Sequence, residues 1–418
     1  MLQDERADKF LREIRAHPEL TDPKAVMDDM LAEMAAGLRG EPSSLMMLPS
    51  YIGRLTEAPE REPAIVIDAG GTNLRRALVT FERAGAEVRE HQNIAMPGTY
   101  GEITQDEFYR RIAEFVLPLT EYSRKIGFIF SYPAEITRER DAVVRYVSKE
   151  LRVGGLVDSV VGLSLTGALD SLGAPDCEVT VLNDTVACML GALPDVSGDE
   201  ELAGLVVGTG VNACYNERAE NIGKIPDAFD MIINTEAGGF SRLKQGEADR
   251  RLDAGTKDPG AFLFEKQVAG AYLGGLVFET ARLAAERGVF SGAFAETLRV
   301  PFDTRVIDAF LAEPDRDFGG LPMDGQNRAA LYTIADKIYE RAAKLVSALA
   351  AAVMVKSGGG PMRIAVDGSL YRQSAVMSAK INAQTRLLLE QTGGRLISYV
   401  CPENANLKGA AAAALRQL

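Results

Sequence analysis

Residues 65–79 read IVIDAGGTNLRRALV. Apolar β-forming residues open it and a second strand-like run closes it, so the pattern predicts two strands joined by a tight turn. The two glycines between the strands supply the backbone freedom that such a hairpin needs. The turn would form without further polar groups. Asp68, Thr72 and Asn73 nevertheless stand where the two strands converge, and they need a reason beyond the turn itself.

A second glycine turn repeats this arrangement in the other half of the chain. VVGTGVNA, residues 206–213, again places small and hydroxyl-bearing residues after an apolar strand. Glycine turns let backbone N–H groups and threonine hydroxyls approach phosphate oxygens closely. Two such turns, each with a threonine and an asparagine, predict two related domains that face one cleft and that each grip phosphate.

Two common nucleotide-binding motifs do not explain these turns. GTGVNA, residues 208–213, fits the dinucleotide pattern G-x-G-x-x-G/A, but the residues that follow are polar and lack the period of the helix which that motif requires. The P-loop pattern G-x-x-x-x-G-K-[ST] does not occur. Strand and helix patterns alternate in both halves of the chain, which predicts an α/β protein.

Length and composition exclude several classes of protein and of active site. The chain has 418 residues, which favours two domains, and its net charge of −13 provides no basic face for nucleic acid. His17 and His91 are the only histidines, so a histidine triad or a histidine-based zinc site is nearly excluded, and a carboxylate or a lysine must do any proton transfer. The four cysteines show no CxxC spacing, and no apolar run reaches the roughly 18 residues of a membrane span. We therefore expect a cytoplasmic protein.

The remaining patterns organise the chain coarsely. Residues 1–62 read as an amphipathic helical extension, and strand patterns follow it. Long helix patterns occupy residues 260–295 and 326–356, and a strand returns within residues 360–372. ANLKGAAAAALRQL, residues 405–418, predicts a closing helix.

Two acidic residues are candidates for chemistry. Asp184, in VLNDTVA, stands where a strand pattern changes to a helix pattern, so its carboxylate can project into a cleft and act as a base. Its alternative role is that of an ordinary helix N-cap. Asp68 fits a Mg²⁺ site, because Mg²⁺ favours one or two carboxylates together with substrate phosphates. Its alternative role is that of a strand-end acid bonded to the turn.

Taken in chain order, the motifs resemble those of the eukaryotic-type hexokinases over nearly the whole length. DAGGTNLR and VGTGVNACY look like the two phosphate motifs of that family, and LNDT looks like its catalytic-aspartate motif. FSYP, with Ser148-Lys149 seventeen residues after its serine, looks like the sugar-binding segment. INTEAGGF and LFEKQVAGAYLG are similar to the two glutamate segments, and VDGSLY and LKGAAAAAL are similar to the adenosine-side motifs.

The resemblance implies a fold of two actin-like (RNase-H-like) α/β domains that flank a ligand cleft, with an N-terminal helical extension. Residues 1–62 would pack with the large domain. The small domain would span residues 63–185 and be completed by a C-terminal helix at 408–418. Residues 186–407 would form the large domain.

The resemblance also implies an activity and a set of site residues. We expect transfer of the ATP γ-phosphoryl group to the 6-hydroxyl of a hexose, with glucose as the expected hexose, Mg²⁺ as the metal and Asp68 beside it. Asp184 would be the general base, assisted by Lys149. The hexose would be bound by Ser131, Ser148, Lys149, Asn183, Asp184, Asn212, Glu236 and Glu265. The nucleotide would be bound by Asp68, Gly70, Gly71, Thr72, Asn73, Arg75, Gly208, Thr209, Gly210, Gly368 and Ser369. The domains would close over the sugar to exclude water as a competing acceptor.

Two alternatives stay open at the level of sequence. Ala237 stands where the family commonly has an aromatic residue, so a kinase acting on an amino sugar or on fructose is the first alternative. A non-catalytic hexose sensor is the second, although such a protein has no chemical need for a base at Asp184. We expect a monomer or a homodimer, with no nucleic acid or membrane partner.

Overall fold

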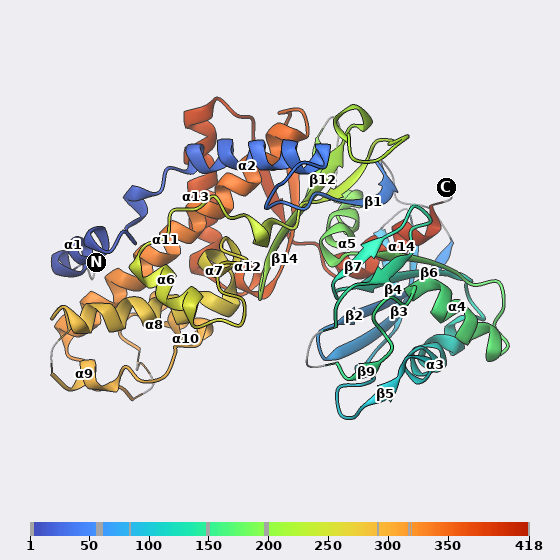
Figure 1. The fold of residues 1–418 in the computed structure, drawn as a ribbon, viewed down its shortest axis with the longest axis horizontal. Helices are drawn as coiled ribbons and strands as arrows, with labels where there is room; N and C mark the ends of the chain where they lie inside the picture. The colour runs from blue at the N-terminus through green and yellow to red at the C-terminus, as the bar shows by residue number, and fades with distance from the viewer. Residues whose placement is uncertain are drawn as a thin grey trace.

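The chain forms two lobes, which Figure 1 shows side by side. The computed structural model describes residues 4–55, 62–82, 85–147, 151–195, 200–290, 292–316, 318 and 320–416. Each lobe is built on one sheet, and helices cover the sheets. Within the described residues, no helix is long and apolar enough to cross a membrane.

The larger sheet has six strands in the order β1-β13-β12-β11-β14-β15. Its members are β1 (Leu48–Gly53), β11 (Glu201–Val207), β12 (Val211–Glu217), β13 (Met231–Asn234), β14 (Met362–Asp367) and β15 (Ile397–Val400). Strands β11, β12, β13 and β1 pair antiparallel in succession, whereas β14 and β15 run parallel to β11.

The smaller sheet has five strands in the order β10-β6-β2-β3-β4. Its members are β2 (Pro63–Gly70), β3 (Asn73–Glu82), β4 (Gly85–Ala95), β6 (Lys125–Phe130) and β10 (Glu178–Leu182). Strands β2, β3 and β4 form an antiparallel meander, and β6 and β10 run parallel to β2. Apart from β1, the two sheets therefore have the same plan, which explains why the sequence contains two similar strand–glycine turn–strand units.

Two helices lie between the sheets, α5 (Asp184–Gly191) and α14 (Ala405–Leu415). One buried apolar cluster contains side chains of both helices together with strand residues of both sheets, among them Val66 and Ala365. The two helices approach each other through glycine, because a Cβ placed on Gly409 would lie 1.8 Å from the carbonyl oxygen of Ala187. This helix pair joins the two lobes.

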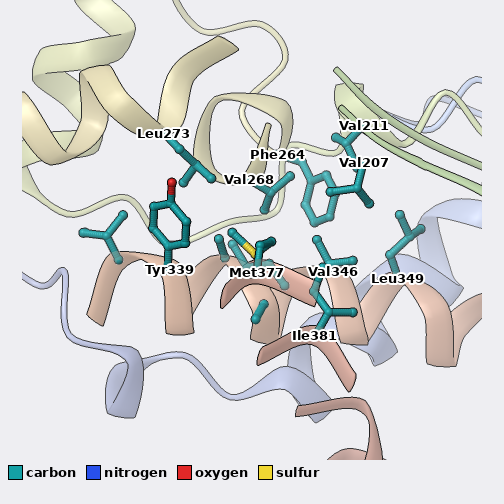
Figure 2. Close-up of a cluster of buried hydrophobic side chains, with 14 of the residues drawn as sticks. Val207, Val211, Phe264, Val268, Leu273, Tyr339, Val346, Leu349, Met377 and Ile381 are labelled. Carbon is teal, nitrogen blue, oxygen red and sulfur yellow. The ribbon is translucent and has the colours of Figure 1, made fainter. Parts of the chain in front are cut away.

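The core of the larger lobe forms around α11 (Gly325–Lys356), which is 32 residues long. Figure 2 shows its buried side chains, such as Tyr339 and Val346, beneath Val207 of β11 and Phe264, with Met377 of the neighbouring helix alongside. The other helices of this lobe are α6 (Glu247–Ala254), α7 (Glu265–Val268), α8 (Gly270–Glu286), α9 (Gly292–Thr297), α10 (Thr304–Ala312), α12 (Ser369–Arg372) and α13 (Ala375–Thr392). The helix pattern of residues 260–295 is thus divided among α7, α8 and α9.

The smaller lobe carries two further helices and four short strands. The helices are α3 (Gln105–Val116) and α4 (Val161–Ser171), and the strands are β5 (Ile103–Thr104), β7 (Ala134–Ile136), β8 (Ala142–Val144) and β9 (Val153–Gly154). Strands β5 and β9 pair with each other, as do β7 and β8. Helices α3 and α4 contribute Phe108, Ile112 and Leu165 to an apolar cluster with Ile67 and Phe128 of the sheet.

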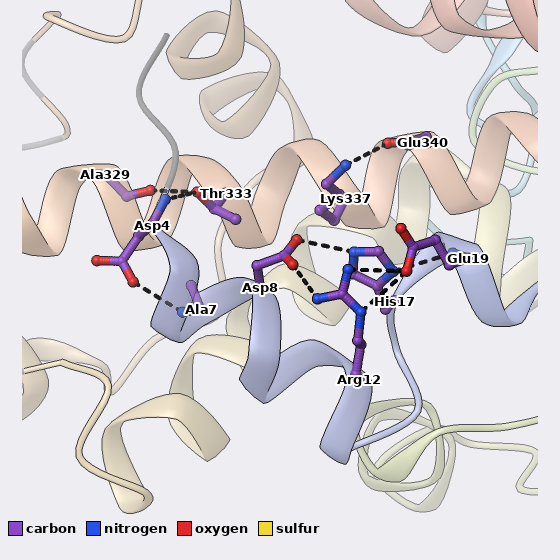
Figure 3. A network of polar contacts seen from close by, with 10 residues as sticks. All are labelled: Asp4, Ala7, Asp8, Arg12, His17, Glu19, Ala329, Thr333, Lys337 and Glu340. Atoms are coloured by element: carbon purple, nitrogen blue, oxygen red, sulfur yellow. Dashed lines mark hydrogen bonds and ion pairs between the residues drawn. The ribbon is translucent and has the colours of Figure 1, made fainter.

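The N-terminal segment lies on the larger lobe through α1 (Glu5–Glu13) and α2 (Pro23–Arg39). Figure 3 shows α1 beside α11, where the backbone N–H of Asp4 donates to Thr333 Oγ1 at 2.9 Å. His17 is buried and donates from Nε2 to Asp8 Oδ1 at 3.0 Å, while its Nδ1 accepts from Glu19 N at 3.2 Å. This histidine is therefore part of the packing of the N-terminal segment.

The prediction of a helical extension over residues 1–62 misses a strand. Residues 48–53 form β1, which pairs antiparallel with β13, Leu48 lying opposite Asn234. Ile52 is buried in the cluster between the sheets. The segment is a strand because an open sheet edge is available to it, and such long-range pairing leaves no helical or alternating signal in six residues.

The closing helix expected within residues 405–418 is present as α14. It starts at Ala405, after Asn404 in the left-handed region with φ 52°, and ends at Leu415. Asparagine tolerates this conformation better than most residues. Pro402 keeps the helix from extending further toward β15.

Candidate active site

The first glycine turn joins β2 to β3 through Gly71 and Thr72. Gly71 adopts φ 57°, a conformation that glycine reaches without strain. The turn is held from two sides, because Tyr132 Oη donates to the carbonyl oxygen of Gly71 at 2.6 Å and Met96 N donates to that of Thr72 at 2.9 Å. The backbone is thus fixed while Gly71, Thr72 and Asn73 stay exposed to solvent, as a phosphate-gripping turn requires.

Asp68 lies beneath this turn and is only 8% exposed. Arg75, directly opposite in the hairpin, approaches it with Nη1 at 3.3 Å from Oδ2. Burial raises the pKa of the Asp68 carboxyl to about 6, the Arg75 guanidinium lowers it, and the carboxylates of Asp184 and Asp367 raise it again. Asn73 donates to Thr72 Oγ1 at 3.3 Å, which orients the threonine hydroxyl.

The second turn, residues 208–210, joins β11 to β12 and is closed by a bond of 2.9 Å from Gly208 N to the Gly210 oxygen. Its glycines are required by close packing of backbone on backbone. A Cβ on Gly208 would lie 2.9 Å from Gly368 Cα, and one on Gly270 would lie 2.9 Å from the Gly208 oxygen. Thr209, at the tip, is exposed. The larger sheet thus presents a fixed backbone turn with one free hydroxyl.

The end of β14 lies beside this turn. Asp367 is opposite Val206 in the parallel ladder, and Gly368 follows with φ 105°. A side chain at Gly368 would collide with the Val207 carbonyl at 2.4 Å. Asn406 Nδ2 donates to Asp367 Oδ2 at 3.0 Å, which connects α14 to this corner. Ser369 begins α12 and is exposed.

Asp184 is the first residue of α5 and follows β10. Strands β2, β6 and β10 run parallel, so their carboxyl ends meet at one edge and bring Asp184 to the side of the first turn. Thr185 donates from Oγ1 to Asp184 Oδ1 at 3.2 Å. Burial raises the pKa of the Asp184 carboxyl, and the charge of Asp367 raises it further. The residue before it, Asn183, accepts from Thr185 N at 2.8 Å and is the helix N-cap.

A network of amides and one carboxylate lies below the second turn. Asn212 Nδ2 donates to Asn234 Oδ1 at 2.7 Å, and Asn234 Nδ2 donates to Glu236 Oε1 at 2.7 Å. Asn212 Oδ1 in turn accepts from the backbone of Ala237 at 3.2 Å. The network fixes the amide and carboxylate orientations, and such preorganised neutral and acidic groups suit a ligand with several hydroxyls.

Two glutamates, Glu236 and Glu265, belong to this part of the site. Glu236 adopts the left-handed region with φ 53°, which is uncommon for a residue other than glycine. Burial raises the pKa of its carboxyl, and the charges of Asp184 and Glu265 raise it further. Glu265 Oε2 accepts from Val211 N at 3.1 Å, and a Cβ on Gly210 would lie 2.6 Å from that oxygen. Burial raises the pKa of Glu265 as well.

Comparison with known proteins decides the family. Family models described as hexokinase match residues 7–193 and residues 202–416. The chain belongs to the hexokinase family. Hexokinase-2 of Oryza sativa subsp. japonica is 30% identical to it over 457 aligned positions, which cover 98% of this chain and 91% of that protein. The protein is therefore a phosphotransferase of the hexokinase type, with ATP and a hexose as its substrates.

Two further relatives define the extent of the similarity. Hexokinase-3 of Homo sapiens is 28% identical over 93% of this chain, but the match covers 44% of the human protein, so this chain spans less than half of its length. A solved structure of hexokinase from Schistosoma mansoni complexed with glucose has a TM-score of 0.81 at 25% identity, with 98% of both chains covered. The expected two-domain α/β fold of the hexokinases is thereby confirmed.

The structure places the predicted nucleotide ligands in two groups, which together are called the phosphate corner after their predicted ligand. The β2–β3 turn holds Asp68, Gly70, Gly71, Thr72, Asn73 and Arg75, and the β11–β12 turn with the end of β14 holds Gly208, Thr209, Gly210, Gly368 and Ser369. The charge of Asp367, at the end of β14, raises the pKa of Asp68. The group of Asn212, Glu236 and Glu265 is called the hexose corner after its predicted ligand. The charge of Asp184 raises the pKa of Asp68 and that of Glu236. Ser131 follows β6 and is exposed, and its backbone N–H donates to Ala69 at 3.1 Å beside the first turn. Ser148 and Lys149 lie outside the described residues.

Two residues of these corners were not assigned from the sequence. Asn234 stands two residues before the predicted Glu236, yet the sequence does not say that its amide bridges Asn212 and Glu236. Asp367 follows an apolar strand and precedes the small residue Gly368, as Asp68 precedes Ala69, so the repeated strand–Asp–small residue pattern was an available signal. Conversely, the side-chain oxygen of Asn183 caps α5, which was the alternative reading of this segment.

Proposed function

We propose that the hexose is glucose, that its 6-hydroxyl is the acceptor, and that Asp184 is the general base. One observation carries this proposal. Asp184 begins α5 at the carboxyl ends of β2, β6 and β10, beside the first glycine turn, and its charge raises the pKa of both Asp68 and Glu236. A base between donor and acceptor is what phosphoryl transfer needs, since the reaction depends on alignment and electrostatics. The glucose bound to the Schistosoma relative supports the choice of sugar.

In the proposed step, one bond to the γ-phosphorus forms while another breaks. Asp184 accepts the proton of the 6-hydroxyl as that oxygen forms its bond to the γ-phosphorus, and the bond from the γ-phosphorus to the bridging oxygen breaks, which releases ADP. A raised pKa makes Asp184 a stronger base, and a positioned base of this kind contributes about 10²–10⁴ in rate. Lys149 and Ser148 are proposed from the sequence, Lys149 as a catalytic residue and hexose ligand and Ser148 as a hexose ligand.

The carboxylates of the phosphate corner suit the Mg²⁺ that accompanies ATP. Asp68 and Asp367 are hard oxygen ligands, and the charge of Asp367 raises the pKa of Asp68, a repulsion that a cation would relieve. Among the described residues, no three acidic, histidine or cysteine side chains could enclose a metal by themselves. Phosphate oxygens and water would therefore supply the remaining ligands. When bound, the cation would neutralise charge on the β- and γ-phosphates.

The remaining parts of the proposal concern the whole chain. We propose that the small domain spans residues 63–185 with the C-terminal helix, that the large domain spans residues 186–407, and that the two close over the sugar. We also propose a cytoplasmic monomer or homodimer acting in carbohydrate breakdown. The free, buried thiols of Cys177, Cys188 and Cys214 support a reducing compartment.

A substrate panel tests the proposed acceptor. Purified protein with Mg-ATP should release ADP with glucose, and the product should carry its phosphate at position 6, as ³¹P NMR would show. 6-Deoxyglucose should raise the melting temperature of the protein without being phosphorylated. Turnover only with an amino sugar or with fructose would reject glucose, and binding without any turnover would favour the sensor.

A further inference from the structure

Phe262 is an exposed aromatic side chain in the segment that leads into Glu265. It is 46% exposed, in contrast to Phe264 two residues later, which is fully buried. Its backbone adopts φ 53°, a left-handed conformation that is a genuine outlier for a bulky residue. The conformation costs on the order of 1–3 kcal/mol, so a glycine would be the easier residue at this position. Neither core packing nor backbone geometry calls for an aromatic ring here.

The surrounding contacts fasten this strained turn in place. Lys266 is buried and donates from Nζ to Asp253 Oδ1 at 2.7 Å and to the Asp258 carbonyl at 2.8 Å. Gly260 N donates to both carboxylate oxygens of Asp253, at 3.1 and 3.0 Å. Lys266 N donates to the Phe262 carbonyl at 3.0 Å, so Phe262 lies one turn before Lys266 and three residues before Glu265. These bonds fix the backbone of the segment, and the Phe262 side chain stays exposed.

The same segment contains the proposed hexose ligand Glu265. The charge of Asp258 raises the pKa of Glu265, and both carboxylates raise the pKa of the Tyr272 hydroxyl, so these side chains lie near one another. Tyr272 is partly buried, whereas Phe262 is open to solvent. An exposed ring three residues from a carboxylate that binds hydroxyls suits a sugar, because the C–H faces of a pyranose are apolar while its edges are polar.

We propose that Phe262 is a specificity-determining residue whose ring covers a C–H face of the hexose held by Glu265. The inference rests on the proposed hexose site and names a contact that the polar network does not supply. It accounts for the strain, since the backbone conformation keeps the ring exposed at the rim. The ring would contribute affinity for a pyranose without taking part in proton or phosphoryl transfer.

The glycine variant separates this role from a structural one. Phe262→Gly relieves the left-handed strain, so its melting temperature should equal or exceed that of the wild type, while the Kd for glucose without nucleotide rises roughly three- to tenfold. The Phe262→Tyr variant should restore binding, and kcat at saturating glucose should stay within about twofold in both variants. A glycine variant that binds glucose as tightly as the wild type would overturn the proposal.

A tryptophan reporter tests the contact directly, because the chain contains no tryptophan. The emission of Phe262→Trp should shift on addition of glucose alone and saturate at the Kd found by calorimetry. Tyr122→Trp is the matched control, since Tyr122 is also exposed but precedes the amino end of β6, whereas Ser131 follows the carboxyl end of that strand. An unchanged emission of Phe262→Trp, while calorimetry shows glucose bound, would overturn the contact. If the wild type itself binds no hexose, the proposed function fails instead.

Discussion

Asp68 is buried, whereas the side chain of its ion-pair partner Arg75 is about half exposed to solvent. The Arg75 side chain is 49% exposed and that of Asp68 is 12% exposed, so water weakens the attraction between them. The carboxylates of Asp184 and Asp367 add repulsion. The result is a carboxyl group that costs stability when it ionises, which is consistent with a site that is completed by a cation and phosphates.

This cost predicts a pH dependence of stability. The pKa of Asp68 rises from 3.8 to about 6 on folding, so the folded state holds the proton more tightly, and the stability from this group is present below about pH 4 and lost as pH rises through about 6. Asp68→Asn should therefore be more stable than the wild type at pH 7, by up to about 3 kcal/mol, and about equally stable near pH 4. Urea unfolding in EDTA at both pH values measures this, and a gap that does not change with pH would refute the assignment.

The sequence indicated candidate site residues, but it did not indicate the hydrogen bonds between them. The glycines and Asp68 were recognisable because a turn with extra polar groups has few structural explanations. The bridge from Asn212 through Asn234 to Glu236 was not, because it joins β12 to the end of β13, and a pattern along one segment carries no cross-strand information. The coupling of Asp367 to Asp68 likewise depends on how the two sheets face each other.

At the level of elements, the pair α5–α14 depends on small residues. A Cβ on Gly191 would lie 2.0 Å from the Ala405 oxygen, and one on Gly127 of β6 would lie 2.2 Å from the Ala410 oxygen. Backbones at such distances leave no space for a methyl group. The alanine-rich composition of α14 therefore serves contact with α5 and β6 as well as helix propensity.

Gly409→Ala tests this contact. Its new methyl group would meet the Ala187 carbonyl at 1.8 Å, so the helices must separate, and we expect a loss of about 2 kcal/mol or more in the free energy of unfolding. Gly167→Ala in α4 is the matched control, because open space surrounds that position, and it should gain about 0.5–1 kcal/mol. Chemical denaturation of both variants measures the difference. Equal effects of the two substitutions would show that α5 and α14 do not pack in this way.

Helices were easier to predict than strand β1. The 3.6-residue period of α11 extends over many turns, and its buried face is apparent in the sequence. Strand β1 becomes a strand only because β13, about 180 residues later, offers a free edge. Its six residues include Pro49 and Gly53, which weaken any local signal.

At the scale of the molecule, two sheets with one plan place two glycine turns on either side of α5 and α14. The order β4-β3-β2-β6-β10 in one lobe repeats as β13-β12-β11-β14-β15 in the other. The repeat in sequence, VIDAGGTN and VVGTGVNA, predicted this relation correctly. The sequence could not predict the side chains that cross between lobes, because their positions depend on the packing of the helix pair.

Closure of the lobes has a measurable consequence. Glucose contacts would be made by the hexose corner of the larger lobe and by residues of the smaller lobe near Ser131, so binding should draw the lobes together. We expect the radius of gyration from small-angle X-ray scattering to decrease when glucose is added. Glu236→Gln, which weakens the network, should need higher glucose concentrations for the same decrease. An unchanged radius at saturating glucose would contradict closure.

Asp184→Asn tests whether Asp184 takes the proton of the acceptor hydroxyl, since the amide keeps the size of the side chain and removes its basicity. Single-turnover ADP formation with glucose should be at least about 10²-fold slower than in the wild type, while calorimetry shows glucose and ATP bound with Kd values within a few fold. A variant that forms ADP at a rate within about tenfold of the wild type would contradict the account.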